Sequence, residues 1–577
     1  MKPTTRSAAM PAPAQTWLGH PPGLFVLFLT EMWERFSFYG MRALLIFYVT
    51  QHFLFERTFG QGLYATYASM VYLMPLFGGL LADRFLGMRK AVSFGAVLLV
   101  LGHFGMAFEG PPAREFIVYD GARYAVTVAE RGNDTVPAVA IDGVAHPIAG
   151  AQNGLRIEAP PAGTLPALLP AGSYERVVER DPFHVQIFYL SLALIIIGVG
   201  FLKPNISTVV GALYEPGDPR RDGGFTIFYM GINIGAAVAT LLCGWLGQTF
   251  GWAYGFGAAG FGMLFGLITF RRGQHLLAGR GGPPAPERLA GKTALGVSME
   301  GLIYAGALLG VVAVWRIIQH QSIVGYLLAA AASVFIVGLL GFSILKCSAV
   351  ERDRMLVAMA LTGFSVLFWT LFEQAGSSLN EFALNNTDLE FFGLFTLTAS
   401  QTQSFNPIFI ILFAPLFSAL WTWAGRRGRD LSTPAKFALA LVQVGLGFLV
   451  LVYGAVHAGA DAQVALVWLI LAYLLHTTGE LCLSPIGLSM ITKLAVWRVM
   501  GLMMGVWFLS SAGAHFLAGQ IAKLTVTESF GGRALDAGAQ LAAYQQVFGT
   551  IGLVALGVGA VLGMLAPLLR KRMHGAG

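Results

Sequence analysis

Long apolar runs, separated by shorter polar segments, repeat along most of the chain. Each run is long enough for a helix to cross the hydrocarbon core of a bilayer. The fourteen runs lie at about residues 24–53, 63–82, 91–108, 185–214, 224–246, 252–270, 295–318, 323–345, 356–378, 404–423, 434–456, 464–494, 501–521 and 545–569. Because fourteen is an even number, both chain ends are expected on the same side of the membrane. The pattern predicts an all-α polytopic membrane protein with 14 transmembrane helices.

The composition supports this class of protein. The 577 residues are 56% hydrophobic and 12% charged, with a mean hydropathy of +0.66, which excludes a soluble protein of several globular domains. Cys243, Cys347 and Cys482 lie in or beside apolar runs and show neither a metal-binding nor a disulfide spacing. We therefore expect no metal site and no disulfide framework.

The distribution of Lys and Arg predicts the orientation. Most of the 37 basic residues fall in segments on the same side as the termini, and the long segment 109–181 holds most of those on the other side. Basic residues accumulate on the cytoplasmic side, and long translocated segments escape this bias. Both termini are therefore predicted to be cytoplasmic. The net charge of +7 reflects this asymmetry, and we expect no nucleic-acid partner.

A repeated loop type divides the chain into related halves. The small and charged residues of 78–90, after the second run, are echoed at 418–429, after the tenth. The predicted parts are an N-terminal tail at 1–22, a first six-helix bundle at 23–270, a linker with an extra hairpin at 271–354, a second six-helix bundle at 355–569 and a C-terminal tail at 570–577. Within the first bundle, 109–181 is an external insertion with short alternating runs. It is either a small β-rich module or a loosely ordered loop, and its role is not readable from the sequence.

The first apolar run carries four charges on one side of the expected helix. At 100° per residue, a stripe of about 140° contains Glu31, Glu34, Arg35, Phe38, Tyr39 and Arg42. Four charges facing lipid would cost about 10–14 kcal/mol, so they must face protein or a wet cavity. A purely structural ion-pair helix is the alternative. Charges inside a membrane are more often functional.

Further polar residues occur in runs of both halves. They are Lys203 before Pro204, Asn233, Glu373, Asn406, His476 and Glu480. Each also has a plain structural explanation: a lysine can extend to the interface, an asparagine can join two helices, and a histidine can lie in the core. The charges expected deep in the membrane are four acids, Glu31, Glu34, Glu373 and Glu480, and three bases, Arg35, Arg42 and Lys203. The excess acid is expected to bind a proton part of the time, which favours a proton-coupled machine over a rigid channel.

Several motifs in order resemble one known family. The sequence Glu31-x-x-Glu34-Arg35-Phe36-x-Phe38-Tyr39-Gly40 resembles the first-helix signature of the proton-dependent oligopeptide transporter family. Further matches begin at Gly78, which resembles the major facilitator loop, at Lys203-Pro204-Asn205, Phe228-Tyr229, Phe368-Trp369, Asn406-Pro407 and Gly479-Glu480. The resemblance covers nearly the whole chain except the insertion.

The resemblance implies a major facilitator fold of two six-helix bundles plus a two-helix hairpin, as in bacterial members. It implies import of di- and tripeptides with protons by alternating access, in a bacterial inner membrane, by a monomer without a cofactor. A carrier of nitrate or another small organic solute, and a receptor that binds peptides without moving them, remain alternatives. An enzyme is not expected, because no nucleophile–base pair, His/Cys cluster or phosphate loop is evident.

The resemblance also assigns roles to residues. The expected peptide-binding residues are Arg35, Tyr39, Tyr72, Lys203, Asn233, Trp369, Asn406, Glu480, Ser484 and Trp507. The amino terminus of the peptide would meet Glu480, and its carboxylate would meet Arg35 and Lys203. The expected proton-coupling residues are Glu31, Glu34, Arg35 and Glu373. The expected gate pairs are Arg42–Glu373 on the outer side and Lys203–Glu480 on the inner side.

Three positions depart from the family pattern. Animal members have a histidine in the second helix where Ala65 stands, so coupling is expected to run through carboxylates. Phe38 replaces the usual second tyrosine of the first signature. Ala514-His515 stands where many members have Gly-Asn, which leaves the role of His515 open.

Overall fold

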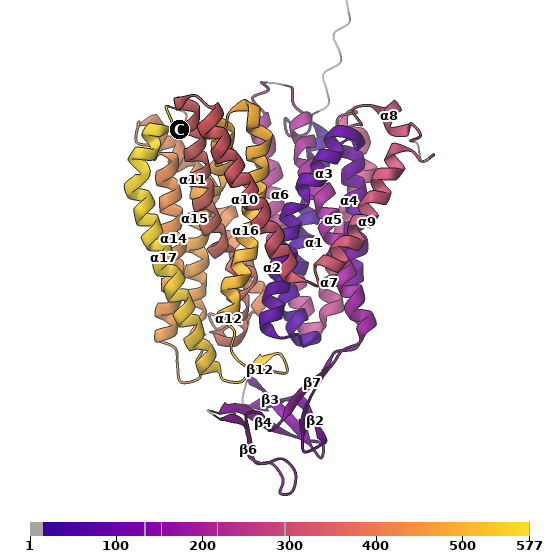
Figure 1. The fold of residues 1–577 in the computed structure, drawn as a ribbon, viewed down its shortest axis with the longest axis vertical. Helices are drawn as coiled ribbons and strands as arrows, with labels where there is room; N and C mark the ends of the chain where they lie inside the picture. The colour runs from indigo at the N-terminus through magenta and orange to yellow at the C-terminus, as the bar shows by residue number, and fades with distance from the viewer. Residues whose placement is uncertain (1–15, 132–133, 152, 216, 294–295, 576–577) are drawn as a thin grey trace, which may run out of the picture.

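The computed structural model describes residues 16–131, 134–151, 153–215, 217–293 and 296–575. Two helical bundles stand side by side, and a small β-rich module lies below them (Figure 1). We call the end of the bundles that faces this module the module end. The C terminus and the short helix α8 lie at the opposite end.

The first bundle and the linker follow the predicted order of helices. The first bundle contains α1 (Pro22–Phe47), α2 (Arg57–Leu73), α3 (Pro75–Leu81), α4 (Met88–Ala107), α5 (Pro182–Ala212), α6 (Arg221–Phe250) and α7 (Trp252–Gly273). The linker contains α8 (Pro286–Ala290) and the extra hairpin of α9 (Met299–Ile317) and α10 (Gln321–Lys346). A π-helical turn, η1 (Tyr48–His52), ends the first span, and α2 continues into α3 across Pro75.

The second bundle is built from the remaining long helices. They are α11 (Ala349–Phe372), α12 (Ser378–Asn386), α13 (Phe405–Arg426), α14 (Thr433–Val456), α15 (Leu466–Leu494), α16 (Met500–Lys523) and α17 (Ala537–Arg572). A 3₁₀ turn, η4 (Glu373–Gly376), joins α11 to α12. Thirteen helical segments of the described chain are long and apolar enough to cross a membrane. The 26-residue α1, with its four charges, adds the fourteenth.

Glycines allow the helices of the first bundle to approach closely. A Cβ added at Gly78 of α3 would lie 2.0 Å from the carbonyl oxygen of Gly200 in α5. A Cβ added at Gly40 of α1 would lie 2.6 Å from the Cys243 sulfur of α6. Such contacts between small residues replace the hydrophobic driving force that helices lack in lipid. The close packing fixes α1, with its charges, against the inner helices.

Three predicted span boundaries are wrong at the module end. Helix α2 begins at Arg57 rather than near residue 63, α12 extends the ninth span from 378 to Asn386, and α17 begins at Ala537 rather than near residue 545. The extra turns contain Arg57 and Glu381, both of which are buried. The reason is that each charge finds a buried partner, so these polar turns remain helical inside the bundle.

The insertion forms a β module. Its strands are β1 (Arg114–Tyr119), β2 (Ala122–Arg131), β3 (Asp134–Ile141), β4 (Val144–Ala151), β5 (Gly154–Ile157), β6 (Leu168–Pro170) and β7 (Glu175–Glu179). They form one antiparallel sheet in the order β6-β5-β4-β3-β2-β1-β7, so the last strand returns beside the first. Its apolar core includes Ile117, Val139, Ile148 and Leu155. Of the two alternatives for 109–181, the structure has the β-rich module.

Candidate functional site

A cavity of about 360 Å³ lies between the two bundles. The charged side chains that line it are Glu31, Arg35, Arg42 and Lys203 from the first bundle and Glu373 and Glu480 from the second. Tyr39, Tyr72, Asn233, Trp369, Asn406 and Ser484 complete the predicted residues on its wall. The structure therefore gathers most of the predicted site residues around one chamber, although they lie up to 453 positions apart in the sequence.

On the α1 wall, Arg35 lies between two carboxylates. Its Nε atom is 3.0 Å from Oε1 of Glu31 and 2.5 Å from Oε2 of Glu34. Glu31 reaches the cavity, whereas Glu34 is fully buried behind Arg35 and does not line it. The guanidinium carbon also lies 5.4 Å from the ring centre of Phe38. This triad holds one positive charge at the cavity with two acids behind and beside it.

Lys203 projects from α5 into the same wall. Its Nζ atom lies 4.0 Å from the ring centre of Tyr72, a cation–π contact that leaves the ammonium at the cavity surface. Asn233 of α6 donates a hydrogen bond to the carbonyl oxygen of Tyr229 in the preceding turn, at 3.0 Å. Arg35 and Lys203 thus bring two basic groups to the first-bundle wall, beside the carboxylate of Glu31 and neighbouring amide and hydroxyl groups.

The opposite wall presents a carboxylate. Asn406 of α13 donates hydrogen bonds from Nδ2 to Oε2 of Glu480 and to Oγ1 of Thr477, each at 3.0 Å. The side-chain amide therefore orients the acid on α15. Ser484 lies one turn further along α15 and also lines the cavity, as does Trp369 of α11.

A second cavity of about 320 Å³ adjoins the first, and both are lined by Tyr72, Lys203, Trp369, Glu373 and Ser484. Trp507 lines this second cavity and not the first, so its expected contact with the peptide stays a prediction. A Cβ added at Gly487 would lie 2.4 Å from the Trp507 ring, so the glycine makes room for the indole.

The predicted outer pair is formed. Arg42 of α1 and Glu373 of η4 make a buried ion pair, and Arg42 Nε donates to the Tyr64 hydroxyl at 2.5 Å. His515 of α16 approaches the same carboxylate, with Nδ1 at 3.5 Å from Glu373 Oε2. Its ring centre lies 4.3 Å from that of Tyr72. The contact gives His515 a defined place, which the sequence left open.

The structure does not join the predicted inner pair. Although both residues are described, no ion pair connects Lys203 to Glu480; Lys203 faces Tyr72, and Glu480 is held by Asn406. Between described residues, the hydrogen bonds and ion pairs that cross from one bundle to the other lie at the Arg42 level or nearer the module end. The cavity is therefore closed toward the module.

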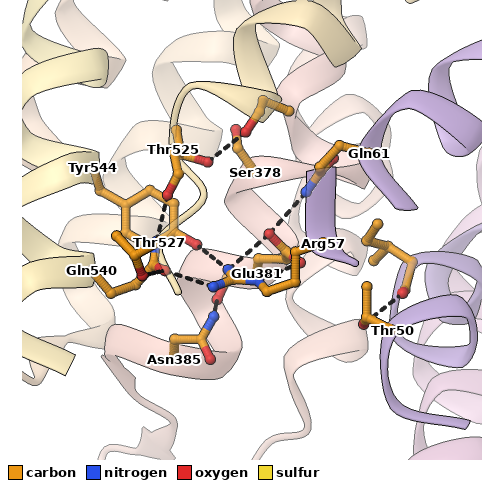
Figure 2. A network of polar contacts seen from close by, with 12 residues as sticks. Thr50, Arg57, Gln61, Ser378, Glu381, Asn385, Thr525, Thr527, Gln540 and Tyr544 are labelled. Atoms are coloured by element: carbon orange, nitrogen blue, oxygen red, sulfur yellow. Dashed lines mark hydrogen bonds and ion pairs between the residues drawn. The ribbon is translucent and has the colours of Figure 1, made fainter. Parts of the chain in front are cut away.

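A second pair of buried charges closes the module end further, and sequence reasoning missed it. Arg57 Nη2 lies 3.0 Å from Oε2 of Glu381, and Gln61 donates to the same oxygen at 2.8 Å (Figure 2). Arg57 Nη1 donates to Gln540 Oε1 at 2.6 Å, and the Tyr544 hydroxyl lies beside the network. Arg57 and Glu381 lie outside the predicted spans, where charged residues are expected in loops, so the sequence offered no reason to pair them.

The structure explains the alanine at position 65 and the place of His476. A Cβ added at Gly519 would lie 2.2 Å from that of Ala65, so α2 and α16 meet too closely there for an imidazole at position 65. His476 is buried beside Gly447 and the ring of Phe448, in the core of the second bundle rather than on the cavity. Among the described residues, no group of three or more His, Cys, Asp or Glu is placed to hold a metal ion.

The geometry defines a membrane carrier with a central chamber between two bundles, lined by both basic and acidic groups. Comparison with known proteins places this carrier in a family. The POT family profile matches residues 89–537. The chain is 34% identical to the peptide transporter YePEPT of Yersinia enterocolitica, over 88% of each chain. It is 29% identical to the dipeptide and tripeptide permease A of Edwardsiella piscicida, over 96% of each.

A solved structure agrees with these relatives. A crystal structure of a peptide transporter POT variant in complex with alafosfalin matches with a TM-score of 0.73 and 31% identity, covering 98% of both chains. The chain belongs to the POT family of transporters, as the resemblance predicted. It is a multi-pass membrane protein of a transporter family rather than of a family of enzymes.

Proposed function

We propose that the protein is a symporter that imports di- and tripeptides together with protons. The single observation that carries the proposal is the chamber of about 360 Å³ with Arg35 and Lys203 on one wall and Glu480 on the other. A small peptide is a zwitterion, with a positive amino terminus and a negative carboxyl terminus. Basic groups on one side of the chamber and an acid on the other can bind both termini through charged hydrogen bonds. The names of the peptide-transporting relatives support the same substrate class.

In this proposal the peptide bridges the two bundles. Its amino group binds the carboxylate of Glu480, which Asn406 already orients. Its carboxylate binds Arg35 and Lys203. Tyr39, Tyr72 and Asn233 from the first bundle and Trp369, Ser484 and Trp507 from the second surround the side chains. Because the peptide touches both walls, its binding changes the relative stability of states that differ in how the walls are placed.

Protons act on the buried acids. Glu31 and Glu34 share Arg35, and Glu373 is paired with Arg42, so protonation of any of these acids releases a basic partner. With Arg42–Glu373 closed, the chamber opens away from the module. Pairing of Lys203 with Glu480 closes that side in the other state. The proton is the only coupling ion in this scheme, and no cofactor takes part.

The proposal includes the orientation in the membrane. The module end faces the periplasm of a bacterial inner membrane, and both termini face the cytoplasm, in agreement with the excess of Lys and Arg in the segments near them. The closed module end then makes the described state inward-facing. Each chain contains a complete chamber, so a monomer is the expected working unit.

Purified protein in liposomes tests the proposal. An inward proton gradient should drive accumulation of a labelled dipeptide above its outside concentration. Unlabelled dipeptide should compete with it, whereas the N-acetylated dipeptide, which lacks the positive amino group, should compete at least tenfold less well. Nitrate uptake in place of peptide uptake would support the alternative carrier. Binding without accumulation would support a receptor, and either result would refute peptide symport.

A further inference from the structure

His515 is a buried titratable group that the proposed transport scheme does not use. It lies on α16 with 5% of its surface exposed and lines the second cavity. Its Nδ1 atom is 3.5 Å from Glu373 Oε2, the same oxygen that Arg42 binds. Two basic side chains therefore converge on one carboxylate.

The two basic partners of Glu373 belong to different bundles. Arg42 is on α1 of the first bundle, whereas His515 on α16 and Glu373 on η4 both belong to the second. When the module end opens, Arg42 must move away from Glu373 with its own bundle. His515 stays beside the carboxylate. A buried carboxylate that loses its only cation is unstable unless it gains a proton or another positive partner.

We propose that His515 and Glu373 form a proton-binding pair that takes the place of the Arg42–Glu373 ion pair when the transporter opens outward. One proton is bound when Arg42 leaves and is released when Arg42 returns, so the charge of the carboxylate is balanced in both states. Histidine is a side chain that can gain and lose a proton near physiological pH, so it suits an exchange of this kind. This inference rests on the proposed function and identifies a further proton-coupling residue.

The surroundings of His515 fit this exchange. The charged and titratable groups that face it are Glu373 on η4, Arg42 on α1, Tyr72 on α2 and Lys203 on α5. Among described residues, α10, α11 and α15 add no charged side chain to these surroundings. With Arg42 and Lys203 both present, a third positive charge on the imidazole meets repulsion. The departure of Arg42 removes part of that repulsion at the moment when the proton is needed.

A distance measurement tests the pair without relying on transport. Spin labels at Thr58→Cys and Ala460→Cys, two exposed sites at the module end of different bundles, report opening in a chain with Cys347→Ser. Lowering the pH from 7.5 to 5.5 should increase the population with the longer distance. One linked proton changes the ratio of the two states by at most about tenfold per pH unit. In His515→Asn the increase of this population between pH 7.5 and 5.5 should be at least threefold smaller than in the wild type. His457→Asn, which removes an exposed histidine, should leave the increase unchanged.

Transport by the same variants separates this proposal from peptide symport. His515→Asn should retain exchange of labelled for unlabelled peptide in the absence of a gradient. Its proton-driven accumulation of peptide should be at least fivefold lower than that of the wild type. An unchanged pH response of the distances, or unchanged driven accumulation, overturns the proposal. Loss of exchange together with driven uptake also overturns it, because His515 would then serve peptide binding or packing. If the wild type moves no peptide, the distance response still decides for or against the pair.

A second observation is independent of the first. Loop residues of the second bundle insert into the β module, which belongs to the first bundle. The hairpin of β12 (Ser529–Phe530) and β13 (Arg533–Ala534) turns at two positive-φ glycines. Phe530 is 1% exposed and belongs to the apolar core of the module. The backbone N–H of Gly531 donates to Glu115 Oε2 at 2.7 Å, and Arg176 lies over the Phe530 ring at 4.7 Å.

The module itself is fastened to the first bundle. Arg180, directly after β7, donates to the carbonyl oxygens of Phe53 and Leu54 at 2.6 and 2.7 Å. The backbone N–H of Ala113, before β1, donates to the carbonyl oxygen of His52 at 2.8 Å. Because both connections are anchored, the module must move together with the first bundle.

We infer that the docked hairpin is a latch between the bundles at the module end, and that it must leave the module each time this end opens. Alternating access moves the module ends of the two bundles apart. Phe530 belongs to the second bundle but is buried in the module of the first, so it must leave the module when the bundles separate. The latch therefore stabilises the inward-facing state and lowers the fraction of outward-facing molecules. This inference also rests on the proposed transport cycle.

An engineered disulfide tests the latch. A Cβ added at Gly150 in β4 would lie 3.8 Å from the Cβ of Leu535, a separation that suits a disulfide. In the Cys347→Ser background, oxidised Gly150→Cys with Leu535→Cys should lose at least tenfold of peptide uptake and should regain it with a reductant. Each single cysteine variant should be insensitive to the oxidant. Full uptake by the cross-linked protein overturns the latch.

A second variant tests the same inference when the wild type transports no peptide. Phe530→Ala should increase the population with the longer Thr58–Ala460 label distance at least fivefold. Phe392→Ala, which truncates an exposed phenylalanine of another loop, is the matched control and should leave this population unchanged. An unchanged population in Phe530→Ala overturns the latch.

Discussion

Asn406 is the residue that sets how Glu480 meets the chamber. Its amide donates to the carboxylate and to Thr477, so one oxygen of the acid is fixed on the cavity wall. The charge of Glu480 is then available to an incoming ammonium group. A carboxylate that is buried and held in this way exerts a stronger attraction than one exposed to water.

The substitution Glu480→Gln should weaken peptide binding strongly. It retains the size of the side chain but removes the charge that the peptide amino group needs. Losing one partner of a buried charge pair costs about 2–5 kcal/mol, which corresponds to a decrease in affinity of roughly 30-fold or more. Binding of a dipeptide to purified protein, measured by calorimetry, checks this. Thr477→Val removes the hydrogen bond from Asn406 and the one that Thr477 donates to the Tyr473 carbonyl oxygen, but it keeps the charge of Glu480 and should cost less. An equal loss in both variants would contradict the role of the charge.

At the residue scale, the sequence predicted the gathering of charges better than their pairings. The positions of Glu31, Arg35 and Arg42 on one helix stripe follow from helical periodicity alone. The approach of His515 to Glu373 and the separation of Lys203 from Glu480 depend on how the bundles meet. That arrangement depends on the conformational state, which periodicity does not determine.

At the scale of elements, the close contact of α3 with α5 depends on Gly78. Gly78→Val should strongly destabilise the fold, because its added atoms would overlap the backbone of Gly200. Overpacking of this kind costs about 1–3 kcal/mol or more. Thermal unfolding in detergent should show a lower midpoint. Gly306→Val in α9 is the matched control, because a Cβ there meets nothing within 4 Å, and an equally lowered midpoint would contradict the explanation.

The junction of α2 with α12 is held by charges. Arg57→Leu removes the guanidinium and leaves Glu381 buried, although Gln61 still donates to it. Breaking a buried pair in this way costs about 3–5 kcal/mol. The module end should therefore open more often. The distance between spin labels at Thr58→Cys and Ala460→Cys should become longer in a larger share of the molecules. An unchanged distance distribution would show that this network does not hold the module end closed.

Helix existence was readable from the sequence, whereas the helix ends at the module end were not. The segment from Glu56 to Gly62 contains charges, glycines and Gln61, which favour a loop when read alone. It becomes helical because Glu381 and Gln540, more than 300 residues away, satisfy Arg57 and Gln61. Tertiary partners of this kind leave no periodic signal. The alternating runs in 109–181 did indicate strands, but the order of the sheet came only from the structure.

At the scale of the whole molecule, the two bundles are joined on one side of the chamber and separate on the other. Arg42–Glu373, the Arg57 network and the docked hairpin act at successively greater depth toward the module. The chamber places Arg35 and Lys203 of the first bundle opposite Glu480 of the second, so a ligand that binds both sides bridges the bundles. In this account, peptide binding, proton binding and the docked hairpin all shift one equilibrium, that between the inward-facing and outward-facing arrangements of the two bundles.

A structure of the protein with a bound dipeptide tests the central claim most directly. The account predicts one peptide in the chamber, with its amino group within hydrogen-bonding distance of Glu480 and its carboxylate toward Arg35 and Lys203. A peptide bound with the opposite polarity, or bound outside the chamber while these three charges remain unoccupied, would contradict the account.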